Sequence, residues 1–131
     1  RLLIPEGPIV KIQIKNEVVE TYESDLAEAP FKLVVLTDGG SASASEIMAG
    51  AVKDSKTGIT VGEKTYGKGT VQQIMRVDGG GVKLTIANYL TPSGFSLDGI
   101  GITPDIEVKS GTAAETSEYA VIKGDRSIEA V

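Results

Sequence analysis

Residues 32–61 constrain the fold more than any other part of this chain. A continuous apolar run with branched side chains at residues 32–37 is typical of a strand buried on both faces of a parallel sheet. Glycines end this run, and residues 43–53 then carry Ile47, Met48, Ala51 and Val52 on one face of a predicted helix. A second short strand is expected at residues 57–61. Strand, tight turn, helix and strand in this order predict a right-handed βαβ crossover.

Two hairpins are predicted on either side of the crossover. Residues 10–14 alternate apolar and polar side chains, and residues 18–22 can return beside them after a polar turn. Residues 71–77 and 82–90 flank an aspartate and three glycines, which is a strong hairpin signal. The sequence therefore predicts an α/β protein with a mixed sheet and β-hairpins.

The overall composition limits the function classes. A chain of 131 residues has the length of one domain, and its net charge of −5 argues against nucleic-acid binding. No apolar run approaches the roughly 20 residues needed to cross a bilayer. Pro104 favours a short edge strand at residues 102–108. From residue 110 the pattern weakens, and residues 119–122 are either a last strand or part of a mobile tail.

The chain contains no histidine and no cysteine, so a lysine is the natural candidate for a catalytic base. Ser43 is the candidate nucleophile. It stands where the first N–H groups of the helix lack partners, and the N–H of Ala44 is placed to stabilise an oxyanion. Ser43 and Glu46 also have capping-box spacing, so the serine could instead serve only as a helix cap. Ser41 and Ser45 are alternative hydroxyls.

Lys68, between two glycines, is the candidate base. A lysine that acts as a base near neutral pH must lose its proton far below its usual pKa of about 10.4, which a closed apolar pocket favours. Residues 65–75 contain no acid that would hold the proton, and Gln72 could orient the amine. The alternative is a solvated lysine in a glycine turn. Lys53 and Lys64 are competing amines.

The same segment partly matches a phosphate-binding P-loop. Residues 62–68 fit its first seven positions, but Gly69 replaces the required serine or threonine. A P-loop should also open a helix, whereas residues 71–77 are predicted to form a strand. We therefore expect no nucleotide binding, and the lack of histidine and cysteine likewise leaves no good zinc site.

Taken together, these motifs resemble the catalytic domain of C-terminal processing peptidases, also called tail-specific proteases. The resemblance covers residues 5–108, and residues 109–131 match only loosely. It is carried by residues 5–10, 33–36, 40–47 (GSASASEI), 61–72 (VGEKTYGKGTVQ), 84–85, 89–94 (YLTPSG) and 99–105 (GIGITPD).

The resemblance implies a crotonase/ClpP-like superhelical ββα core and a serine endopeptidase with a Ser/Lys dyad. The family nucleophile falls on Ser43, its base on Lys68, the supporting glutamine on Gln72 and one oxyanion donor on the N–H of Ala44. It implies no metal or organic cofactor. The partners would be protein or peptide substrates cut near their C-termini, in the periplasm or at the outer face of a membrane.

Two family features have no counterpart in this sequence. One is the substrate-binding PDZ domain, and the other is an upstream glycine segment that completes the oxyanion hole. We therefore expect a partial catalytic domain over residues 1–131, weak or inactive alone, because a lost oxyanion donor costs about 100- to 1000-fold in rate. An open sheet edge could pair two copies. The alternatives are a non-catalytic binding module and a dimerisation scaffold on the same fold.

Overall fold

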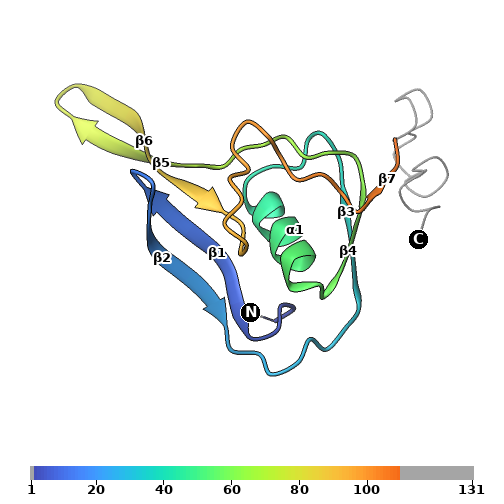
Figure 1. Ribbon diagram of the computed structural model, residues 1–131. Coiled ribbons are helices and arrows are strands. Elements are labelled where there is room, and N and C mark those ends of the chain that lie inside the picture. Colours follow the sequence, from blue (N-terminus) through green and yellow to red (C-terminus); the bar gives the residue numbers. More distant parts are fainter. Residues whose placement is uncertain (1, 110–131) are drawn as a thin grey trace.

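The computed structural model of the protein describes residues 2–109, in which one helix lies between two sheets (Figure 1). The elements are β1 (Gly7–Ile14), β2 (Glu17–Ser24), β3 (Leu33–Thr37), α1 (Ala44–Ser55), β4 (Gly58–Gly62), β5 (Thr70–Val77), β6 (Gly80–Leu90) and β7 (Ile106–Glu107). An antiparallel sheet has the order β2-β1-β6-β5, and a parallel sheet has the order β3-β4-β7. The strand considered at residues 119–122 lies outside the described residues.

The antiparallel sheet is built from the two predicted hairpins. Lys15 and Asn16 both have positive φ, 48° and 70°, as a two-residue type I′ turn between β1 and β2 requires. The β5–β6 hairpin closes after Asp78, where Gly79 has φ 82°. Strands β1 and β6 then pair with each other, so that Ile12 faces Tyr89. The sequence patterns predicted each hairpin, and the structure adds that the two form one sheet.

The parallel sheet confirms the predicted crossover from β3 through α1 to β4. The predicted edge strand is also present, because β7 pairs with β4 at the edge of this sheet. The prediction that β3 is buried on both faces is wrong. Val34 and Leu36 are each 43% exposed, because α1 covers one face of the sheet and no second helix of residues 2–109 covers the other.

Small side chains on α1 let both sheets approach the helix. Ala51 and Val52 are fully buried and pack with Ile4 beside β1 and β3, while Ala49 packs with Leu97 in a second cluster. Met48, which was predicted to share the buried face, is 41% exposed instead. No helix among the described residues has the length and apolar character needed to span a membrane. The N-terminal end of α1 faces the loops that precede β5 and follow β6, and the candidate site lies there.

Candidate active site

Ser43 occupies a strained backbone conformation immediately before α1. Its φ of 55° and ψ of −114° fall in a region that residues with a side chain rarely adopt. Such strain costs on the order of 1–3 kcal/mol and is found mainly at functional sites. A sharp, strained turn between a strand and a helix is also how hydrolases expose a nucleophilic serine. The conformation favours a catalytic interpretation of Ser43 over a simple helix cap.

The capping-box arrangement of Ser43 and Glu46 is present. Its well-formed bond runs from the Ser43 N–H to Glu46 Oε2, at 2.9 Å. The Ser43 hydroxyl makes no side-chain cap hydrogen bond of this quality. By contrast, Ser41 Oγ donates to Asp38 Oδ1 at 2.9 Å and accepts from the Asp38 N–H at 3.1 Å. The Ser41 hydroxyl is therefore fixed by its own turn, whereas the Ser43 hydroxyl meets α1 only through the looser capping-box contact with the Glu46 N–H.

A fully buried carboxylate, that of Glu46, joins the serine turn to the lysine loop. Oε1 accepts from Thr65 Oγ1 and from the Gly67 N–H, each at 2.6 Å. Oε2 accepts from the Ser43 N–H at 2.9 Å and from the Lys68 N–H at 2.8 Å. Four hydrogen-bond donors suit an ionised carboxylate, which can accept hydrogen bonds but cannot donate one. Two bonds to one oxygen keep the backbone nitrogens of Ser43 and Lys68 within about 6 Å of each other.

The lysine loop is also bonded to the loop that follows β6. Thr65 Oγ1 accepts from the Ile102 N–H at 2.7 Å, and the Thr65 N–H donates to the Ile102 carbonyl at 3.1 Å. The Gly67 carbonyl accepts from the Gly99 N–H at 2.8 Å. Gly67 has φ 91°, and a Cβ there would lie 2.8 Å from a backbone nitrogen of the opposite loop. The glycine therefore serves both the turn and the close contact between the loops.

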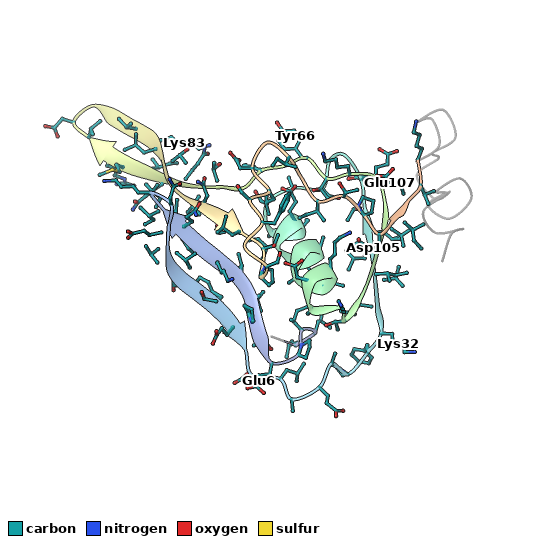
Figure 2. The ribbon with its side chains drawn as sticks, in the orientation of Figure 1. Glu6, Lys32, Tyr66, Lys83, Asp105 and Glu107 are labelled. Atoms are coloured by element: carbon teal, nitrogen blue, oxygen red, sulfur yellow. The ribbon has the colours of Figure 1, made fainter. Side chains whose placement is uncertain are left out.

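Lys68 itself is exposed and faces an open pocket. The described part of the chain does not by itself form the closed apolar pocket that would favour a neutral lysine amine. Residues 65–75 contain no acid, but Asp98 from the loop after β6 lines the same pocket. Lys53, a competing amine, pairs with Asp105 at 2.7 Å. The pocket is lined by Gly40, Ala42, Tyr66, Gly67, Lys68, Thr70, Gln72 and Asp98. In Figure 2, Tyr66 and Glu6 lie at opposite ends of the molecule.

Gln72 extends from β5 into the lining of this pocket. The pairing of β5 with β6 shifts between Val71 and Gln72, so that Val71 faces Ala87 and Gln72 faces Thr85. Ile86 is the extra residue of this bulge. Bulges redirect side chains and are common beside active sites. The structure therefore brings Gln72 and Lys68 to one pocket, and the segment after Lys68 is a strand, not the helix that a P-loop requires.

Ala44 is the first residue of α1 and is exposed, with no hydrogen bond from its N–H to any group of residues 2–109. In the same range, no direct hydrogen bond joins the Ser43 hydroxyl to the Lys68 amine. Catalytic hydrogen bonds are often longer in ligand-free enzymes than in substrate complexes. Gly40 and Ala42, just before Ser43, line the pocket with Lys68. The four predicted residues therefore lie around one end of α1. The described residues show no cluster suited to a metal ion.

Sequence comparison assigns the chain to a family. The sequence model of peptidase family S41 matches residues 1–108. The chain belongs to peptidase family S41. The chloroplastic C-terminal processing peptidase of Tetradesmus obliquus is 41% identical over 111 residues, which cover 82% of this chain and 24% of that protein. The carboxy-terminal-processing protease of Bartonella bacilliformis is 45% identical over 97 residues, or 73% of this chain and 22% of that protein.

Solved structures of S41-type proteins agree with this fold. The photosystem II D1 C-terminal processing protease superposes with a TM-score of 0.77 at 40% sequence identity, covering 82% of this chain and 29% of that chain. The chain thus spans about a quarter of the length of the curated S41 relatives it matches. The mixed α/β architecture, with one parallel and one antiparallel sheet, is the architecture of this family.

Proposed function

We propose that this chain carries the Ser/Lys catalytic core of a C-terminal processing peptidase. Ser43 is the nucleophile, Lys68 the general base, Gln72 the group that orients the lysine, and the Ala44 N–H one oxyanion donor. The observation that carries the proposal is the strained Ser43 backbone, tied by Glu46 to the backbone of Lys68. A helix cap would require neither the strain nor the connection to a lysine loop.

The chemistry is acyl transfer in two stages. Ser43 Oγ attacks the carbonyl carbon of the scissile peptide bond while its proton passes to the neutral amine of Lys68. The carbon–nitrogen bond then breaks, and the lysine ammonium returns the proton to the leaving amine. In the second stage Lys68 takes a proton from water, whose oxygen attacks the ester carbonyl. The ester bond breaks, the Lys68 ammonium returns this proton to Ser43 Oγ, and the second peptide product leaves with a new carboxyl group.

Backbone donors at the start of α1 suit this chemistry. The positive end of the helix dipole favours negative charge on the carbonyl oxygen, and within residues 2–109 the Ala44 N–H is free to donate a hydrogen bond to that oxygen. Glu46 already binds the N–H of Ser43, so the two neighbouring N–H groups have different tasks. One holds the serine turn in place, and the other is available to the reacting oxygen.

The test of this proposal uses the protein at the length at which it is naturally expressed. Cleavage of an unfolded protein substrate is measured for the wild type, Ser43→Ala, Lys68→Ala and the control Lys64→Ala. Lys64 is a neighbouring exposed amine, so its removal leaves the proposed dyad intact. We expect a loss of at least about 1000-fold for the first two variants and little change for the control. Wild-type activity in Ser43→Ala or Lys68→Ala would refute the dyad.

Several finer features belong to the same proposal. The relatives are named as C-terminal processing enzymes, so we infer that proteins with accessible C-termini are the substrates. We also infer the crotonase/ClpP-like superhelical arrangement and a location outside the cytoplasm, as in the family that the sequence resembles. Mass spectrometry of the products, which should come from one end of the substrate, checks the first point. Cell fractionation checks the location.

A further inference from the structure

We propose that Asp98 selects substrates by charge, favouring a lysine or arginine side chain next to the cleaved bond. This inference rests on the proposed peptidase function. Asp98 is exposed and lines the same pocket as Lys68 and Gln72. One carboxylate oxygen, Oδ1, accepts from the Gly69 N–H at 3.1 Å. The carboxylate makes no ion pair with any residue from 2 to 109, so Oδ2 remains available to a ligand.

The position of this carboxylate is set by the backbone around it. Leu97, the preceding residue, is 1% exposed and belongs to the core, and the following residue, Gly99, bonds to the lysine loop. Gly69 fits closely against Asp98, since a Cβ there would lie 2.6 Å from the Asp98 nitrogen and 2.8 Å from its Cβ. Asp98 is therefore held directly beside the residue that follows Lys68.

The charges of the pocket explain why this position matters. Lys68 and Asp98 are the charged residues in its lining, and the remaining lining residues are neutral. A lysine that acts as a base is neutral when the serine attacks. At that moment Asp98 is the one charged side chain of the lining. A substrate ammonium or guanidinium in the pocket is attracted by it, and a substrate carboxylate is repelled. Exposed charge pairs change equilibria by factors of about two to five, so we expect about a fivefold preference.

The test uses peptides that differ at one residue beside the cleaved bond, with lysine, glutamine or glutamate there. The ratio of kcat/KM for the lysine and glutamate peptides is measured for the wild type and three variants. Asp98→Asn keeps an oxygen for the Gly69 N–H but removes the charge, and Asp98→Glu keeps the charge. Glu6→Gln removes an exposed negative charge at the opposite end of the molecule from Tyr66 (Figure 2). We expect Asp98→Asn alone to lose the preference, and 0.5 M salt to weaken it in the wild type.

Binding measured without catalysis separates this inference from the proposed function. Fluorescence anisotropy of labelled peptides is followed with Ser43→Ala and with the double variant that adds Asp98→Asn. The single variant should bind the lysine peptide more tightly than the glutamate peptide, and the double variant should not. If Ser43→Ala still cleaved peptides, the dyad would be wrong while the anisotropy still tested Asp98. An undiminished lysine preference in Asp98→Asn, or no preference in the wild type, would overturn the inference.

Discussion

Replacing Glu46 by glutamine should disrupt the link between the serine turn and the lysine loop. The carboxylate is fully buried and accepts four hydrogen bonds, two at each oxygen. A glutamine of the same shape keeps one oxygen and turns the other into an NH2 group. This group cannot accept, so it faces two donors without bonding them. Whichever way the amide is oriented, two of the four hydrogen bonds are lost.

The size of the effect follows from these two bonds. A hydrogen bond to a charged group contributes about 1.5–3 kcal/mol, so two lost bonds cost roughly 3–6 kcal/mol. The whole free energy of unfolding of a domain is about 5–15 kcal/mol. We therefore expect Glu46→Gln to fold only marginally. Because Oε1 binds the lysine loop and Oε2 binds both segments, activity should fall even in molecules that remain folded.

Urea unfolding followed by circular dichroism measures the change in free energy. Glu28→Gln is the matched control, because Glu28 is exposed on the connection between β2 and β3. It should change the free energy of unfolding by less than about 0.5 kcal/mol. If Glu46→Gln were destabilised by less than 1 kcal/mol relative to this control, the assignment of four strong hydrogen bonds to Glu46 would be wrong.

Three further predictions concern strain, packing and acid. Ser43→Gly should relieve the backbone strain at φ 55° and raise the free energy of unfolding by about 1 kcal/mol. The same change should abolish peptidase activity. A variant less stable than the wild type would contradict the strain at Ser43. Gly67→Ala should cost about 1–3 kcal/mol in urea unfolding, because its Cβ would meet two backbone nitrogens at 2.8 and 2.9 Å. Burial raises the pKa of Asp105, but hydrogen bonds from Lys53 and Thr60 outweigh it and hold this pKa below the usual 3.8. The stability that this lowered pKa contributes is present above pH 3.8 and is lost as the pH falls through the lower folded-state pKa. Asp105→Asn should therefore destabilise the protein at pH 7, and by progressively less as the pH is lowered. A difference from the wild type that did not change with pH would refute this.

Local patterns were enough to predict the two hairpins and the crossover. The alternation in residues 10–14 and the glycine turn after Asp78 act over a few residues, and the structure shows the strands they predict. The exposure of Val34 and Leu36 could not be predicted in this way. An apolar strand has the same sequence whether its outer face is covered or open, because the cover comes from other parts of a protein.

The details of the candidate site depend on contacts between residues that are far apart in the sequence. Glu46 has the sequence signature of a helix cap, yet three of its partners lie 19 to 22 residues further along the chain. Asp98 reaches the lysine loop across 29 residues, so the local run around Lys68 gave no sign of it. The positive φ of Ser43 was also hidden, because the sequence marks such conformations clearly only where glycine occupies them.

The β5–β6 hairpin has a practical consequence for handling the protein. Its tip extends away from α1 (Figure 1), and Asp78 and Gly79 are both exposed there. Exposed loop tips of this kind tolerate inserted residues. A fluorophore or a short affinity tag placed between these two residues should therefore leave the serine turn and the lysine loop unaltered. The same position is where we expect length to vary most readily between natural versions of this domain.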